Sequence, residues 1–228
     1  MTEPATAVGT PRPADNAAPP QHRWVFHYAV DGDLRFISHH DTLRLFARAL
    51  ARASLPVRFS AGFNPHPRIT IPLPRPVGIA SSAEAVIVEF EKPIDAEDAV
   101  ARLNGTLPSG LRIQHARRLS AGERLQPALV RYRLAPCVDL APILPSRIRS
   151  LLESDVVQTQ RSSPKKASPV CVNIRPFVAE LHTDGHVVEF SLHVTAAGAA
   201  KPSEIAGLLG FDAASINHRI RRMEVQWR

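Results

Sequence analysis

The order of apolar and polar residues in the first half of the chain predicts strands interleaved with two helices. Residues 23–30 alternate apolar or aromatic side chains with polar ones, which is typical of a half-buried strand. In the segment 41–53 the apolar residues recur at helical spacing, and Pro56 stops this helix. A second helix is expected to begin near Asp95, and the turn residues 31–33 predict a hairpin. Further strands are expected at 34–38, 56–60, 68–73, 85–93 and 110–119.

The same order of elements returns in the second half of the chain. Strand, helix and strand recur, with an Arg-Arg pair near the end of each half. This repeat predicts an α+β protein made of two tandem ferredoxin-like (βαββαβ) units with antiparallel sheets. The expected elements are strands at 128–136, 156–160 and 215–227, helices at 145–154 and 201–210, and a hairpin over 168–194 that turns at Asp184-Gly185.

Changes in composition set the expected boundaries of these units. Residues 1–22 are rich in Pro and Ala, which predicts a disordered leader. The first unit is expected to span 23–120 and the second 127–228, with a seam at 120–126. Within the second unit, the segment 159–169 is rich in Ser, Lys and Pro and is expected to be a flexible loop.

The charge of the chain favours an anionic partner. Its formal net charge is +7 and its pI is about 10.2, so RNA, DNA or an acidic protein surface would be attracted to it. An arginine-rich composition can also reflect genomic base composition. Arginine nevertheless differs from lysine, because its planar guanidinium grips a phosphate or carboxylate through two parallel hydrogen bonds.

Cysteine content and hydropathy argue against several classes of protein. Cys137 and Cys171 lie far apart, so no thiolate-held zinc or iron–sulfur site is expected in this chain, and both are expected to be reduced. The leader lacks the apolar core of a secretion signal, and no apolar run approaches the roughly eighteen residues of a membrane span. A cytoplasmic protein is expected.

Candidate chemistry begins at residues 38–41, Ser-His-His-Asp. Ser38 is placed as a helix N-cap, and Asp41 three residues later makes a variant of the capping box. Helix-start chemistry accounts for these two residues without any further function. It explains His39 and His40 less well.

Three arginines of the expected helix share one face. Arg44, Arg48 and Arg52 are spaced four residues apart, where like charges repel by about 0.2–0.5 kcal/mol per pair. A bound anion or nearby carboxylates would relieve this repulsion. Two interpretations stay open, a solvated arginine face and a phosphate-binding face.

The segment Gly-Phe-Asn-Pro-His-Pro, residues 62–67, holds a histidine between two prolines. Pro65 and Pro67 favour extended conformations at Asn64 and His66, and Gly62 permits a turn with positive φ. Rigid placement of His66 suits catalysis or specific recognition. A short loop stiffened by proline for stability is the alternative.

Two further possibilities concern metal and enzyme chemistry. His39, His40 and Asp41 could join His66 in a two-histidine, one-carboxylate metal triad, but this requires convergence across the sheet, and no metal ligand is assigned. No glycine-rich phosphate loop, nucleophile elbow or zinc-protease helix motif is present. Arginine and histidine without an obvious nucleophile fit a binding module, or a metal-independent RNA-cleaving site, better than a hydrolase of small molecules.

Residues 34–90 resemble the radical-SAM-linked, or radical-SAM-associated, protein family, a domain of unknown function. Members of that family carry an Arg-Phe-x-Ser-His-x-Asp segment, a helix with regularly placed arginines, and Gly-Phe-Asn-Pro-His-Pro. His40 departs from the pattern, because the family usually has an apolar residue there. The positions that match the motifs are Arg35, Phe36, Ser38, His39 and Asp41, then Gly62, Phe63, Asn64, Pro65, His66 and Pro67.

The resemblance implies a partner enzyme. Members occur as separate small proteins or fused behind cobalamin-binding-type radical SAM enzymes, so the iron–sulfur cluster and S-adenosylmethionine are expected on the partner and not on this chain. The tandem ferredoxin-like arrangement is also similar to that of the CRISPR repeat-processing endoribonucleases, a likeness that rests on fold alone.

Three functional hypotheses follow. The leading one is a cytoplasmic accessory protein that binds RNA or another anionic substrate and presents it to a radical SAM enzyme. The second is an RNA-processing or RNA-modifying enzyme that uses His39 and His66 as acid and base. The third is an interaction scaffold whose arginine stripe meets acidic residues of the partner. In the leading hypothesis the anion would be contacted by Arg35, Arg44, Arg48 and Arg68, and the specific or reactive centre would be formed by His39, Asp41, Asn64 and His66.

Overall fold

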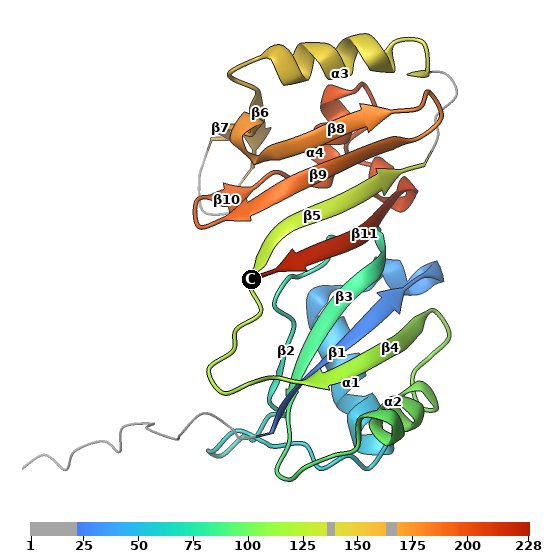
Figure 1. The fold of residues 1–228 in the computed structure, drawn as a ribbon, viewed down its shortest axis with the longest axis vertical. Coiled ribbons are helices and arrows are strands. Elements are labelled where there is room, and N and C mark those ends of the chain that lie inside the picture. Colours follow the sequence, from blue (N-terminus) through green and yellow to red (C-terminus); the bar gives the residue numbers. More distant parts are fainter. Residues whose placement is uncertain (1–21, 136–139, 163–167) are drawn as a thin grey trace, which may run out of the picture.

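The computed structural model of the protein describes residues 22–135, 140–162 and 168–228 (Figure 1). Within these ranges the chain forms four α-helices and a mostly antiparallel sheet of nine strands, so the expected α+β class is confirmed. The predicted leader, apart from His22, and Cys137 lie outside the described residues. None of the helices in the described ranges combines the length and apolar character that crossing a membrane requires.

Local sequence explains the two helices of the first half. Helix α1 (His39–Arg52) buries Phe46 and Leu50 on its apolar face. Helix α2 (Ala96–Asn104) begins after Asp95, whose carboxylate accepts a hydrogen bond from the Asp98 N–H as an N-cap. The other elements of this half are β1 (Arg23–Val30), the 3₁₀-helix η1 (Gly32–Phe36), β2 (Ile69–Thr70), β3 (Ala80–Glu89) and β4 (Leu111–Arg118).

The second half contains the expected helices and hairpin. Strands β8 and β9 form the hairpin around Asp184 and Gly185. Gly210, with φ of +93°, follows α4 in the left-handed conformation that ends many helices. The elements are β5 (Pro127–Leu134), α3 (Leu144–Glu153), β6 (Gln158–Arg161), β7 (Val170–Asn173), η3 (Arg175–Phe177), β8 (Val178–Thr183), β9 (Val188–Thr195), β10 (Gly198–Ala199), α4 (Pro202–Leu208), η4 (Ile216–Arg219) and β11 (Ile220–Trp227).

Strands from both halves join in one continuous sheet. Its order is β10–β9–β5–β11–β3–β1–β4, with β8 also paired to β9 and β2 to β3. The halves meet where β11 lies parallel to β3, with Arg221 opposite Ala80 and Arg222 opposite Ser81. Figure 1 shows this joint at the middle of the molecule.

The helices pack on one face of this sheet and form two hydrophobic cores. In the first half, α1 and α2 cover β1, β3 and β4 through residues such as Phe46 and Leu103. In the second half, α3 and α4 cover β5, β8 and β9 through residues such as Ile148 and Ile205. Figure 1 shows α1 and α4 behind the strands.

The opposite face of the sheet, referred to below as the open face, is covered in part by the connection between β4 and β5. Leu119 and Leu125 of this connection pack on Val25, Ala85 and Ile87 in a small third cluster. Arg117 of β4 and Glu123 of the connection form an ion pair with an N–O distance of 2.7 Å. Elsewhere the open face carries charged side chains such as Arg131 of β5 and Glu224 of β11, which form an ion pair at 2.7 Å.

A buried ion pair lies at the joint between the halves. Nη1 of Arg222 on β11 is 2.9 Å from Oε1 of Glu84 on β3, and these side chains are 2% and 1% exposed. The Arg222 guanidinium also lies 5.9 Å from the ring centroid of Tyr132. Burial raises the pKa of the Tyr28 hydroxyl, and Glu84 raises it further, so Tyr28 stays neutral at this joint.

The structure differs from the sequence prediction in several segments. Residues 56–60 were expected to form a strand but make only isolated bridges, from Val57 to Phe90 and from Phe59 to Pro67. Residues 34–38 were expected to form a strand but lie mainly in η1, because β1 is already paired with β3 on one side and β4 on the other. The expected loop 159–169 begins in a strand, since Thr159–Arg161 belong to β6 and pair with β7. Residues 163–167 of that loop lie outside the described ranges.

Candidate anion-binding site

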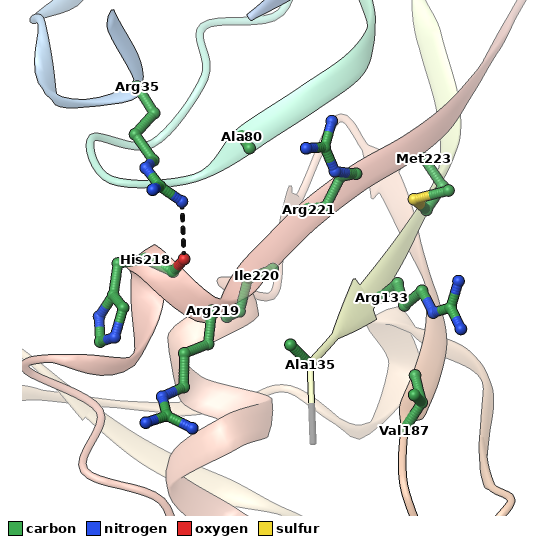
Figure 2. Close-up of a pocket in the computed structure, with 10 residues that line it drawn as sticks. All are labelled: Arg35, Ala80, Arg133, Ala135, Val187, His218, Arg219, Ile220, Arg221 and Met223. Atoms are coloured by element: carbon green, nitrogen blue, oxygen red, sulfur yellow. Dashed lines mark hydrogen bonds between the residues drawn. The ribbon is translucent and has the colours of Figure 1, made fainter. Parts of the chain in front are cut away.

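A pocket of about 510 Å³, referred to here as the arginine pocket, lies at the ends of three strands. Strands β3 and β11 begin side by side there, and β5 ends beside β11. Its volume falls in the range of small-ligand sites. The lining combines four arginines and a histidine with five apolar residues, as Figure 2 shows: Arg35, Arg133, His218, Arg219 and Arg221 with Ala80, Ala135, Val187, Ile220 and Met223.

Two of these arginines face each other across neighbouring strands. Arg133 of β5 is directly opposite Arg221 of β11 in an antiparallel pair, a position at which like charges destabilise a sheet. Arg221 forms an ion pair with Asp31, and Arg133 lies 3.7 Å from the carboxylate of Glu189. Both carboxylates lie outside the ten described lining residues, whose charged members are all arginines.

Arg35 is held in the pocket from both its backbone and its side chain. Its carbonyl accepts hydrogen bonds from the Arg75 guanidinium and the Gly78 N–H, each at 2.7 Å. Its Nη1 donates to the carbonyl of His218 at 2.9 Å, and its buried Nε has no hydrogen-bond partner among the described residues. Buried polar groups are normally paired, so this N–H is an unsatisfied donor beside the pocket.

The guanidinium groups surround the pocket instead of gathering at one point. In Figure 2 those of Arg35, Arg219, Arg221 and Arg133 lie apart from one another, around Ala135 and Ile220. Such an arrangement suits several anionic groups spaced along one ligand better than one small anion. The arginine pocket is therefore the candidate anion-binding site in the described chain.

Comparison with known proteins identifies the family. The model of the family described as "Uncharacterized protein conserved in bacteria (DUF2344)" matches residues 23–202. The chain belongs to this family. The DUF2344 match ends before η4 and β11, so Arg219 and Arg221 lie beyond it.

No curated protein matches the chain in sequence. Among solved structures, the chain is similar to one described as "Crystal Structure of an Unknown Protein from Galdieria sulphuraria", with 14% identity and a TM-score of 0.25. The alignment covers 91% of this chain and 98% of that one, but a score this low supports no argument about fold.

The Ser38–Asp41 segment of this DUF2344 protein starts α1 as expected. Ser38 Oγ accepts a hydrogen bond from the Asp41 N–H at 3.1 Å and donates one to the Asp41 carboxylate at 2.7 Å. This bond from Ser38 lowers the pKa of Asp41, and Arg44 lowers it further. The rings of His39 and His40 contact each other edge to face, with centroids 5.6 Å apart. The capping interpretation is therefore confirmed.

Replacing Ser38 by alanine should lower the free energy of unfolding by about 1 kcal/mol, because the Asp41 N–H loses its partner at the helix start. Urea denaturation followed by circular dichroism measures this change. Ser38→Asn restores a capping oxygen and is expected to recover most of the loss. Equal stability of Ser38→Ala and the wild type would contradict the capping role.

The predicted arginine stripe lines a second cavity, of about 450 Å³, between α1 and the segment that follows α2. Arg44 pairs with Asp41 at 3.1 Å, and Arg52 donates to the carbonyl of Thr106 at 2.6 Å. Among the described residues Arg48 has no ion-pair or hydrogen-bond partner, and it is exposed. This cavity, the α1 groove, is thus less densely charged than the spacing alone suggested.

His66 lies in an exposed loop at the other end of the first half. Its N–H donates to Ser60 Oγ at 2.9 Å, and Gly62 has the expected positive φ, +119°. The loop joins the end of β3, because the Arg58 N–H donates to the carbonyl of Glu89 and the Arg68 N–H to that of Arg58. Arg68 also lies 3.8 Å from the Glu89 carboxylate, and Asn64 is exposed.

The predicted site residues therefore do not form one cluster. His39 and Asp41 follow η1, which packs beside the first residues of β3, whereas His66 lies by its last residues. The ten residues of β3 span roughly 30 Å. Within the described ranges, no group of three or more His, Cys, Asp or Glu side chains could hold a metal ion.

Sequence reasoning found Arg35 but missed the other arginines of the pocket. Arg133 lies on a strand that was expected, and nothing in its local sequence marks it. His218, Arg219 and Arg221 belong to the basic run His-Arg-Ile-Arg-Arg, residues 218–222, of which only the Arg-Arg pair enters the repeat argument. That run was the signal that could have pointed to a site.

Proposed function

We propose that this DUF2344 protein binds RNA, or another phosphate-bearing polyanion, at the arginine pocket and presents it to a partner enzyme. The observation that carries this proposal is the direct pairing of Arg133 with Arg221 beside Arg35, in a pocket whose ten described lining residues include no carboxylate. A phosphate group there would add to the relief that Asp31 and Glu189 already give this pair of like charges, and it would accept bidentate hydrogen bonds. The net charge of +7 adds long-range attraction for the same class of ligand.

RNA is favoured over a small anion by the spread of the positive groups. Phosphates along a strand can meet guanidinium groups on β5, β11 and η1 at the same time. The apolar part of the lining, including Met223 and Val187, suits contact with sugars and bases. A small dianion would engage a subset of these arginines.

The proposed partner is a radical SAM enzyme, which would carry the iron–sulfur cluster and S-adenosylmethionine. This part of the proposal rests on the resemblance of residues 34–90 to radical-SAM-linked proteins. The α1 groove, with exposed and unpaired Arg48, supports a contact between this surface and acidic residues of the partner. The separation of His39 from His66 gives no support to the alternative in which they act as acid and base.

We also infer that each half of the protein is a ferredoxin-like unit, with the connection near 120–126 as the seam. The strand orders β4–β1–β3–β2 and β11–β5–β9–β8 support this inference, because each corresponds to the fourth, first, third and second main strands of a βαββαβ unit. Each set is covered by two helices of its own half. On this interpretation the arginine pocket lies at the joint of the two units.

Filter binding of a single-stranded RNA at several salt concentrations tests the proposed function. Four arginine–phosphate contacts predict a slope of about −3 in the logarithm of the association constant against the logarithm of salt. The dissociation constant should therefore rise roughly 50-fold between 50 and 200 mM salt. Absence of binding at low salt, or binding that salt does not affect, would contradict the proposal.

A further inference from the structure

Two stacked imidazole rings lie on the open face of the sheet. His27 of β1 is directly opposite His115 of β4. Their ring centroids are 4.5 Å apart and their planes differ by 18°. The separation is close to the distance between neighbouring strands, so the rings stand side by side, each above its own strand. We refer to them as the histidine pair.

The outer ring of the histidine pair is accessible. His27 is half-buried between Ala85 and His115, whereas His115 is exposed. Strand β4 ends the strand order, so no other described strand continues the stack beyond His115. Burial, together with the neighbouring His115 and Arg117, lowers the pKa of His27 to about 4, so this ring is neutral near pH 7.

A β-bulge sets the direction of the side chains around the pair. The register of β4 against β1 shifts between Ile113 and His115, and Gln114 is the extra residue. Leu111 and Ile113 point into the core on the helix side, so Arg112 between them faces the open side, as does Arg117 beyond His115. Within the described chain Arg112 has no ion-pair partner, whereas Arg117 is paired with Glu123.

Polar contacts link the histidine pair to the arginine pocket. The Gln114 side chain crosses β1 and donates to the carbonyl of Ser82 at 3.2 Å. The hydroxyl of Ser82 accepts a hydrogen bond of 3.3 Å from Arg221, which lines the pocket. The two features therefore share one face and are joined through β3.

We propose that the histidine pair is a stacking platform for a base of single-stranded RNA, with Arg112 as a contact to the adjacent phosphate. The proposal deepens the proposed function, on which it rests, by adding a base-binding subsite to the phosphate-binding pocket. Bases stack on aromatic side chains with little sequence preference, and an exposed ring beside an unpaired arginine provides both contacts. The neutral ring of His27 stacks on the inner face of His115, on the side away from the proposed base, and adds no charge.

The test compares an oligoadenylate of about ten nucleotides with an abasic oligonucleotide that carries the same number of phosphates. Wild-type protein should bind the oligoadenylate about 5-fold more tightly or better. His115→Ala should remove this difference and leave the affinity for the abasic strand unchanged. His115→Phe, which keeps an aromatic ring, should preserve the difference.

A matched control is His193→Ala, which removes an exposed histidine from β9 on the same face but away from the pair. This variant should bind both strands as the wild type does. If wild-type protein binds both strands equally, or if His115→Ala keeps the preference, the stacking proposal is wrong. The proposal of a phosphate-binding pocket is not affected by that result. If neither strand binds, the proposed function itself fails.

Discussion

Replacing Arg222 by leucine is expected to lower the free energy of unfolding by about 3–5 kcal/mol. The Arg222 side chain is 2% exposed, and its guanidinium is the charged partner of Glu84, which is 1% exposed. The substitution leaves the Glu84 carboxylate buried without an opposite charge at 2.9 Å. An unpaired buried charge is among the most costly changes a fold can suffer, because neither water nor protein solvates it. Urea denaturation measures the loss.

Two further variants separate this effect from general damage to β11. Arg221→Leu changes the neighbouring residue, whose ion pair with Asp31 is substantially exposed, and should cost at most about 1 kcal/mol. The double variant Glu84→Leu/Arg222→Leu removes both charges and should recover much of the stability, because no unpaired charge remains. A loss for Arg222→Leu no larger than that for Arg221→Leu would contradict the role of the buried pair.

Most of the secondary structure could be predicted because apolar periodicity is a local property. The helix at α1 follows from its apolar stripe and the Ser38 cap, and the hairpin at Asp184-Gly185 from its turn residues. The prediction of a strand at residues 34–38 is wrong for a non-local reason. The turn residues 31–33 are compatible with a hairpin, but both edges of β1 are paired with strands from later in the sequence, β3 and β4. Local patterns carry no information about such competition.

The candidate site was harder to predict because it is assembled from distant segments. Arg35 could be named from its motif, yet its partners in the pocket come from β5, η4 and β11, almost a hundred residues or more away. The parallel contact of β11 with β3 brings them together, and a repeat in the sequence does not specify how its two halves join. The proline-held His66 was conspicuous in the sequence, but the chain places it at the far end of β3.

Charge reversal at two residues of the arginine pocket should weaken RNA binding roughly 100-fold or more at low salt. Hydrogen bonds to charged groups contribute about 1.5–3 kcal/mol each, and the variant Arg133→Glu/Arg219→Glu removes two such donors and adds repulsion. Both side chains are exposed, so their replacement leaves the hydrophobic cores intact. The salt slope should also fall in magnitude by about 1.4, because roughly 0.7 is lost for each phosphate contact on a single strand. Filter binding at several salt concentrations gives both quantities.

The matched control for this variant is Lys92→Glu/Arg149→Glu, which makes the same change in net charge at exposed residues outside the pocket. If binding depended on the overall charge of the protein, both double variants would lose affinity equally, and the pocket assignment would be wrong. If the pocket binds the phosphates, the control loses a small, purely long-range part of the affinity, because exposed charges beyond about 10 Å are largely screened at 0.1 M salt. Thermal melting of both variants checks that they remain folded. The comparison therefore tests whether RNA affinity depends on the arginines of this pocket or on the net charge of the chain. The direct pairing of Arg133 with Arg221 implies that it depends on the pocket.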